Sequence, residues 1–148
     1  AIQQTTTTSF KVELLQAVHN FGPTSPDTFY IALYTGAAAL GPTTTAYTSV
    51  GEVSGTGYTA GGQALTISQS PTYGLDSSVD QIPTAFISFA NAAWAGASFT
   101  ARGALIYNSS KANRSVAVLD FGADKTSTTT FTVTMPANTS TTALLRFP

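Results

Sequence analysis

The side chains able to do acid–base chemistry are sparse in this chain of 148 residues, which carries one histidine and seven acidic residues. Four of the acids form two close pairs, Asp76/Asp80 and Asp120/Asp124. Paired carboxylates hydrolyse a glycosidic bond when they flank the sugar at a suitable separation. Aspartates in loops more often cap turns by accepting backbone hydrogen bonds. We expect the turn-capping role here, with a glycan hydrolase kept as an alternative.

The single histidine, His19, lies in a segment that predicts a helix, near the edge of its apolar face. A catalytic histidine needs a nucleophile and an orienting acid around it, and a histidine metal site usually needs more than one imidazole. The chain has no cysteine, which excludes disulfides, thiolate metal sites and thiol nucleophiles. We therefore expect a hydrogen-bonded His19 at the boundary of the core, no catalytic residue, no cofactor and no metal. A single calcium site built from carbonyl and carboxylate oxygens is the alternative.

Two other features have both a chemical and a structural interpretation. The segment 55–62 (GTGYTAGG) resembles a phosphate-binding loop, but it lacks the G-x-G-x-x-G spacing and no Gly-Lys-Ser/Thr follows. No helical pattern follows it either, so we expect a turn-rich loop in which glycine permits positive φ or close backbone contact. The lone tryptophan, Trp94, suits a sugar platform, although packing in the core or at an interface is the favoured interpretation.

The composition favours contact with other proteins. Apolar residues make up 43% of the chain, but charged residues make up only 9%, far below the roughly 25% of ordinary soluble domains. Serine and threonine, about 40 residues together, replace the missing charges on the surface. The formal net charge of −1 leaves no basic footprint for nucleic acid or for an anionic membrane. The apolar stretches are too short to span a bilayer, and the first residues lack the pattern of a signal peptide, so we expect an intact start.

One segment predicts a helix near the start of the chain. Ser9 can cap it, and Gly22 followed by Pro23 can end it. Between them, apolar residues recur with the period of an amphipathic helix. The expected helix covers about 10–21, with an apolar face made of five residues: Phe10, Leu14, Ala17, Val18 and Phe21.

The remainder of the chain has the alternation and the turn signals of short strands. Expected strands cover 28–35, 63–68, 84–90, 99–108, 115–121, 128–135 and 142–147, with a loop at 69–83. Seven or eight short strands with one helix predict a mainly β, single-domain β-sandwich or jelly roll over residues 9–148. Residues 1–8 have no core-facing pattern, so we expect an extended arm, disordered alone, that orders on a neighbouring subunit.

Three stretches carry a resemblance to a known family: 14–22 (LLQAVHNFG), 50–62 (VGEVSGTGYTAGG) and 101–122 (ARGALIYNSSKANRSVAVLDFG). Together they resemble a family of small virion structural proteins of tailed bacteriophages, over roughly residues 9–135. The third stretch is the most specific, and the C-terminal residues 143–148 carry little of the match. The resemblance implies a non-enzymatic component of the virus particle, made in the cytoplasm of a bacterial host.

Within that resemblance we favour a capsid decoration, or cement, protein that binds the major capsid protein on the outer surface of the shell. Contacts made of hydroxyl and apolar groups depend less on salt than ion pairs do. Sites of local three-fold symmetry on a shell favour a homotrimer. The alternative is a tail, neck or fibre component, including a receptor- or glycan-binding module. The expected interface residues are Ile2, Thr5, Thr6, Thr7, Thr8 and Trp94.

Overall fold

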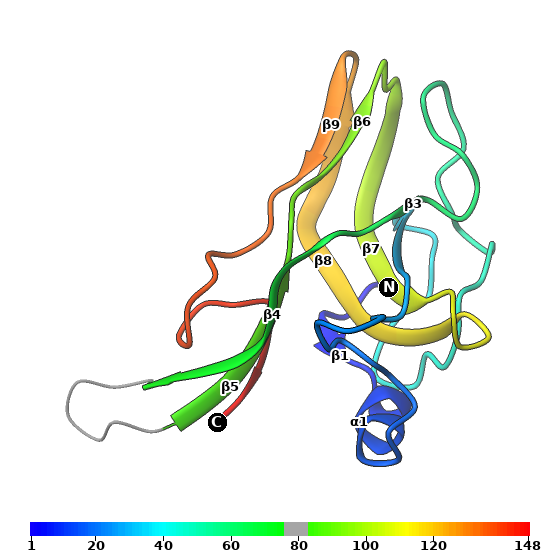
Figure 1. Ribbon diagram of the computed structural model, residues 1–148. Helices are drawn as coiled ribbons and strands as arrows, with labels where there is room; N and C mark the ends of the chain where they lie inside the picture. Colours follow the sequence, from blue (N-terminus) through cyan, green and yellow to red (C-terminus); the bar gives the residue numbers. More distant parts are fainter. Residues whose placement is uncertain (76–82) are drawn as a thin grey trace.

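A computed structural model describes residues 1–75 and 83–148. Within these ranges the chain is mainly β, with several antiparallel sheets and one short helix, and it forms a β-sandwich as predicted (Figure 1). The jelly-roll topology stays a prediction. The strand order of the sheets determines where the candidate sites lie.

The largest sheet has five strands in the order β1-β8-β7-β2-β3. Strands β7 and β8 form the expected hairpin, whose tip covers residues 109–113. Strand β2 pairs with β7 on one side and with the short β3 on the other, so β1 and β3 are the edges. The bounds are β1 Thr5–Thr6, β2 Phe29–Tyr34, β3 Gln63–Ala64, β7 Phe99–Asn108 and β8 Arg114–Ser127.

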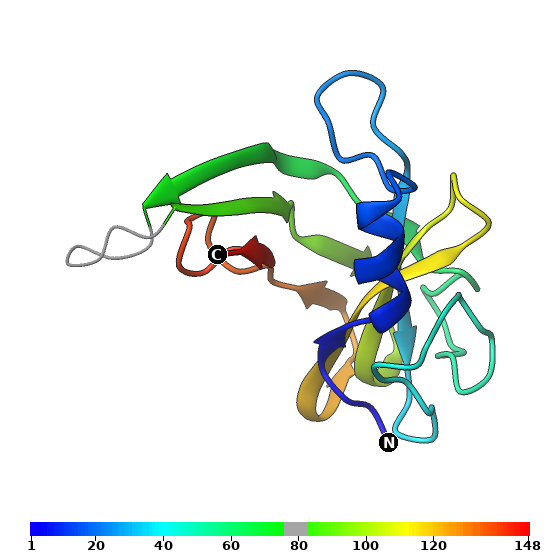
Figure 2. The same ribbon diagram turned by 90° about the horizontal axis from the view of Figure 1, so that it is seen from below.

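Two smaller sheets complete the fold. Strands β10, β5 and β4 form one of them in that order, and β6 and β9 form the other. Strands β4 and β5 run away from the five-stranded sheet and project at one end of the molecule (Figure 2). The bounds are β4 Ile67–Leu75, β5 Pro83–Phe89, β6 Ala92–Ala95, β9 Thr130–Val133 and β10 Leu145–Phe147.

The five-stranded sheet is buried on both faces. On strand β2, Phe29, Ile31 and Leu33 face the main core between the sheets, as the alternation predicts. The alternate residues Ala32 and Tyr34 face a second apolar cluster on the opposite side. The segment between β2 and β3 contributes Ala38, Leu40 and the partly buried Tyr47 to that second cluster. The buried members of the cluster are Ala32, Tyr34, Ala38, Leu40, Leu105, Tyr107 and Val118.

The helix is shorter than predicted. Helix α1 covers Thr8–Leu15, and its N-cap is Thr7, whose hydroxyl accepts from the backbone N–H of Phe10. The expected Gly22 does not end it, because Ala17 takes the left-handed conformation at φ 59°. The N–H groups of Ala17 and Val18 bond back to the carbonyls of Leu14 and Glu13, which is the bonding pattern of a Schellman ending.

The expected arm is wrong as a description of residues 1–8. Thr5 and Thr6 form strand β1, which pairs with Val118 and Ala117 of β8. Thr7 is fully buried, and Thr8 begins the helix. Residues 5–8 therefore belong to the sheet, the helix cap and the start of the helix. An edge strand is held by backbone hydrogen bonds, so a run of threonines can form one without showing an apolar pattern.

Other corrections concern the β elements. The segment expected as a loop at 69–83 contains the second half of β4 up to Leu75, and β5 begins at Pro83. Strand β6 lies where no strand was expected, and β8 extends six residues beyond Phe121, to Ser127. Residues 128–129 and 134–135 lie outside β9, although the predicted alternation of Phe131 and Val133 into the core is confirmed.

Candidate functional site

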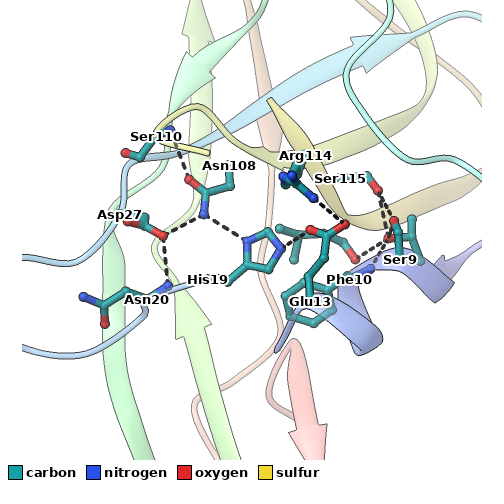
Figure 3. A network of polar contacts seen from close by, with 12 residues as sticks. Ser9, Phe10, Glu13, His19, Asn20, Asp27, Asn108, Ser110, Arg114 and Ser115 are labelled. Atoms are coloured by element: carbon teal, nitrogen blue, oxygen red, sulfur yellow. Dashed lines mark hydrogen bonds and ion pairs between the residues drawn. The ribbon is translucent and has the colours of Figure 1, made fainter. Parts of the chain in front are cut away.

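A buried polar network surrounds His19 (Figure 3). Its Nε2 lies 2.8 Å from Oε2 of Glu13, and its Nδ1 lies 2.9 Å from Nδ2 of Asn108. The amide of Asn108 also donates to Asp27 at 2.8 Å, and its oxygen accepts from the backbone N–H of Ser110 at 3.0 Å. Because that oxygen is committed to Ser110, the Asn108 nitrogen donates to Nδ1 of His19.

The network selects one tautomer of a neutral imidazole. With Nδ1 accepting, the proton of a neutral His19 sits on Nε2 and is donated to Glu13. The His19 side chain is fully buried, and both of its ring nitrogens form hydrogen bonds with protein side chains. The expectation of a hydrogen-bonded histidine is confirmed, although the residue is more deeply buried than a boundary position.

Two basic side chains form ion pairs with the acidic residues of the network. Arg114 of β8 places Nη1 3.4 Å from Oε1 of Glu13, and Lys111 places Nζ 3.7 Å from Oδ1 of Asp27. Asp27 also accepts from the backbone N–H of Asn20 at 2.9 Å. The network thus joins the helix, the loop after it and the tip of the β7–β8 hairpin, and we assign it a positioning role.

A second cluster is built around Glu52. Its carboxylate accepts from the hydroxyls of Tyr47 at 2.6 Å and Tyr58 at 2.7 Å, and from the backbone N–H of Gly61 at 2.7 Å. The hydroxyl of Tyr107 donates to the Gly61 carbonyl at 2.6 Å. This carboxylate holds the segment between β2 and β3 in place. The predicted turn-rich loop at 55–62 is confirmed as part of that segment.

The tyrosines of this cluster resist ionisation. Burial and the neighbouring Glu52 carboxylate raise the pKa of Tyr47 to about 12. Burial, followed by the charge of Glu52, also raises the pKa of Tyr107 to about 12. The pKa values of Tyr34 and Tyr58 rise further, and burial is again the main cause. The cluster is therefore stable as neutral phenols around one carboxylate.

The acid pairs have different outcomes. Asp76 and Asp80 lie outside the described residues. Asp120 and Asp124 lie beside the Arg102 guanidinium, at 3.4 and 4.0 Å. Asp120 also accepts from the backbone N–H of Gly122 at 2.9 Å, which lowers the pKa of its carboxyl together with Arg102. The turn-capping role is thus confirmed for Asp120.

A groove opens between the two sides of the sandwich. Its larger part, of about 520 Å³, is lined by apolar residues of β8, β9 and the segment after β9, with Asp120 and Lys125 as the charged residues in its wall. Its smaller part, of about 420 Å³, lies between β1 with β8 on one side and residues 142–145 on the other. Gln4, Leu119, Pro136 and Leu144 line both parts, so the two are neighbours.

The structure separates the expected interface residues. Thr5 and Thr6 line the smaller part of the groove, and Thr8 is exposed on the helix. Ile2 is half-buried against the second apolar cluster, and Thr7 is fully buried. The list of six residues is therefore too broad.

Trp94 is wrong as an interface residue. It is buried in the main core, with 6% of its surface exposed, and its ring packs against Tyr58 and Phe131. Its strand β6 pairs with β9, which places the indole among the inward-facing side chains.

Sequence reasoning missed the exposed apolar side chains outside the expected interface. Leu15 is 91% exposed on the helix, and Tyr73 is 72% exposed on β4. The signal was weak for Leu15, because Leu14 and Leu15 are adjacent and the assumed helix placed only Leu14 on the core. Tyr73 lies in the segment 69–83, where the sequence predicts a loop. Within residues 1–75 and 83–148, the other large apolar residues with exposed side chains are Val12, Val50, Leu75 and Phe147.

Comparisons with family models, with curated proteins and with solved structures find no match to this chain. In residues 1–75 and 83–148, no group of three or more histidine, cysteine or acidic side chains is arranged to hold a metal ion. Over the same ranges, no helix has the length and apolarity that crossing a membrane requires.

Proposed function

We propose that this chain is a structural protein of a tailed-bacteriophage particle and that it decorates the outside of the capsid as a homotrimer. The three stretches that resemble virion proteins and the low proportion of charged residues support this role. The observation that carries it is the open edge of β1 beside the smaller part of the groove. This edge suits an extended segment of the major capsid protein.

The backbone of Thr6 is the element that such a segment would use. Thr7 donates its N–H to the carbonyl of Val116, so in this antiparallel pair the backbone groups of Thr6 point away from β8. The described residues that line the smaller part of the groove beside them are all uncharged, and most are threonine or aliphatic residues. An uncharged, extended peptide adds to such an edge through main-chain hydrogen bonds.

Copy number in purified particles tests the location. We expect mass spectrometry with labelled standards to count hundreds of copies per particle, in a fixed ratio to the major capsid protein. A few copies, up to a few dozen, would place the protein in the tail, neck or fibre instead. A glycan array then tests the receptor-binding version of that alternative.

The contact with the shell has a test of its own. Thr6→Pro removes the outward N–H while a proline is tolerated at a strand edge. We expect this variant to fold and to lose binding to capsids that lack decoration. Thr6→Val keeps the N–H and the β-branched shape, and we expect it to bind like the parent. Equal binding of the proline variant would exclude the edge of β1 as the contact.

A further inference from the structure

The side-chain amide of Asn108, at the end of β7, is the junction of the polar network in Figure 3. It is fully buried. Its nitrogen donates to Nδ1 of His19 and to Oδ2 of Asp27, and its oxygen accepts from the backbone N–H of Ser110. An amide nitrogen has two protons to donate, so both are in use. These three partners together fix which way the amide faces.

The amide lies where two loops meet. One is the segment 16–28 between α1 and β2, and the other is the hairpin tip 109–113. The backbone N–H of Thr28 donates to Oγ of Ser110 at 2.8 Å, and the Thr28 carbonyl accepts from the backbone N–H of Ser109 at 3.0 Å. The contacts of the buried amide therefore reinforce a direct connection between the two loops.

A second proton on the His19 ring has no acceptor in this arrangement. A proton on Nδ1 would point at the Asn108 nitrogen 2.9 Å away, so that two donors face each other. Turning the amide over would bring its oxygen to the ring. The same turn would set that oxygen against Oδ2 of Asp27 and the amide nitrogen against the N–H of Ser110. Proton uptake by the ring therefore breaks both of the other contacts of the amide.

The charged groups around the ring are already paired. Glu13 of α1, which meets Nε2 of His19, has Nη1 of Arg114 from β8 3.4 Å from its other oxygen. Asp27, in the segment before β2, lies 3.7 Å from Nζ of Lys111 in the hairpin tip. The two acids and the two bases balance while the ring is neutral. A proton on the ring therefore adds one uncompensated positive charge to a buried site, which is costly.

We propose that His19 is an acid-sensitive switch that holds the segment 16–28 on the hairpin tip 109–113. While the ring is neutral, it accepts from Asn108 and the two loops stay together. When Nδ1 takes up a proton, the amide turns over, its other two hydrogen bonds break, and the loops separate while the strands below them stay paired. Histidine ordinarily changes its charge between about pH 5 and 8, so mild acid is the signal.

An NMR titration of the unmodified protein tests the switch, because the chain contains one histidine and its ring signals are unambiguous. We expect the ring nitrogens to show the Nε2–H tautomer at neutral pH and a doubly protonated ring in acid. Amide exchange of Ser110 and Thr28, corrected for the intrinsic rate at each pH, should rise together with ring protonation. Since one proton drives the opening, this exchange should rise about tenfold per pH unit below about 6.5, until the loops are fully open.

The amide of Ile106 separates a local opening from general unfolding. Ile106 is fully buried in the middle of β7, opposite Ile31 of β2, and its protection should not change over the same pH range. A ring that gains its second proton without faster exchange at Ser110 and Thr28 would overturn the proposal. A ring that stays neutral until Ile106 loses its protection would overturn it as well.

Two variants assign the response to the histidine. His19→Gln keeps an N–H donor for Glu13 but cannot take up a proton, so we expect its corrected exchange at Ser110 to be the same at neutral and mildly acidic pH. Asp124→Asn is the matched control: it removes an exposed acid outside the network and should keep the tenfold slope of the parent. An acid response that persists in folded His19→Gln would assign the opening to the carboxylates and overturn the proposal. If His19→Gln does not fold, the titration of the unmodified protein, with Ile106 as its reference, still decides.

Discussion

Nε2 of His19 and Oε2 of Glu13 lie 2.8 Å apart in the interior, six residues apart in sequence. The pair lies next to the end of the helix. Glu13 supplies both the carboxylate that meets His19 and the carbonyl that accepts from Val18. Glu13 thus contributes to the hydrogen bonds that end the helix and to the buried network, and the chain turns back at Ala17.

Removing the Glu13 carboxylate should destabilise the fold. Glu13→Ala leaves the buried His19 donor without an acceptor, and an unsatisfied buried group costs about 1–3 kcal/mol. Urea unfolding should show a free energy of unfolding that is lower by that amount, with a correspondingly lower midpoint. Asp124→Ala is the control, because its carboxylate is 66% exposed and its ion pair with Arg102 is 4.0 Å long; its effect should stay within about 0.5 kcal/mol. Equal midpoints for both variants would contradict a structural role of the network.

The helix ending offers a stabilising substitution. Ala17 has φ 59°, a left-handed conformation that costs a residue with a Cβ roughly 1–2 kcal/mol. Ala17→Gly removes this cost but adds backbone entropy to the unfolded state. We expect a net gain of about 0.5–1 kcal/mol by urea unfolding. A loss of stability would mean that the exposed Ala17 methyl contributes more than its strain.

Alkaline pH should weaken the fold through the tyrosine cluster. Tyr47 and Tyr107 have pKa values of about 12 in the folded protein, raised from the ordinary 10.0. A raised pKa means that the folded state favours the neutral phenol. Its stabilising contribution is therefore complete below pH 10 and is lost as the pH rises towards 12.

Thermal melting across this window measures the loss. We expect a constant melting temperature from pH 7 to about 9.5 and a decline above it. Tyrosinate absorbance should rise along with unfolding. Glu52→Gln should lower stability at neutral pH, by about 1–3 kcal/mol, because two hydroxyls and one N–H lose a charged acceptor. A normal phenol titration in the folded protein would contradict the burial of these tyrosines.

Substitutions at two glycines distinguish the cost of backbone strain from the cost of a steric clash. Gly62 has φ 79°, and a Cβ there would lie 1.8 Å from the carbonyl oxygen of Ile31. Gly96 has φ 63°, and a Cβ there meets nothing within 4 Å. Gly96→Ala should cost about 1 kcal/mol, whereas Gly62→Ala should cost several times more and shift β2 or β3. Similar costs in thermal unfolding would contradict the close approach of the loop to β2.

The sequence predicts a strand well where polar turn residues mark its end. Strand β7 has the predicted bounds because a polar hairpin tip follows it. Alternation alone is a weaker guide, because the alternating segment 128–135 forms a strand only over Thr130–Val133. The end of the helix was not predictable in this way. Nothing in the type of Ala17 marks a left-handed residue, whereas Gly22 does carry that signal, so the pattern favoured the later position.

The polar network around His19 could not be predicted from the sequence, for a different reason. Glu13 and Asn108 are 95 positions apart, and only the pairing of β7 with β2 and β8 brings them to the same histidine. Local patterns do not report such contacts. Local patterns also do not report the partners of Trp94, because a single tryptophan in the sequence says nothing about the rings that pack on it. They do not report the exposure of Tyr73 either, because it depends on the projection of β4 from the body of the molecule.

The pairing of Thr5 with Val118 constrains how the chain reaches this structure. Strand β1 and helix α1 leave the ribosome more than a hundred residues before β8, so they must wait for β8 before they find their partner. Sheets that depend on such distant pairings fold slowly, on the scale of milliseconds to seconds. During synthesis β1 therefore has no native strand to pair with until β8 is made, and the five-stranded sheet cannot be completed before then.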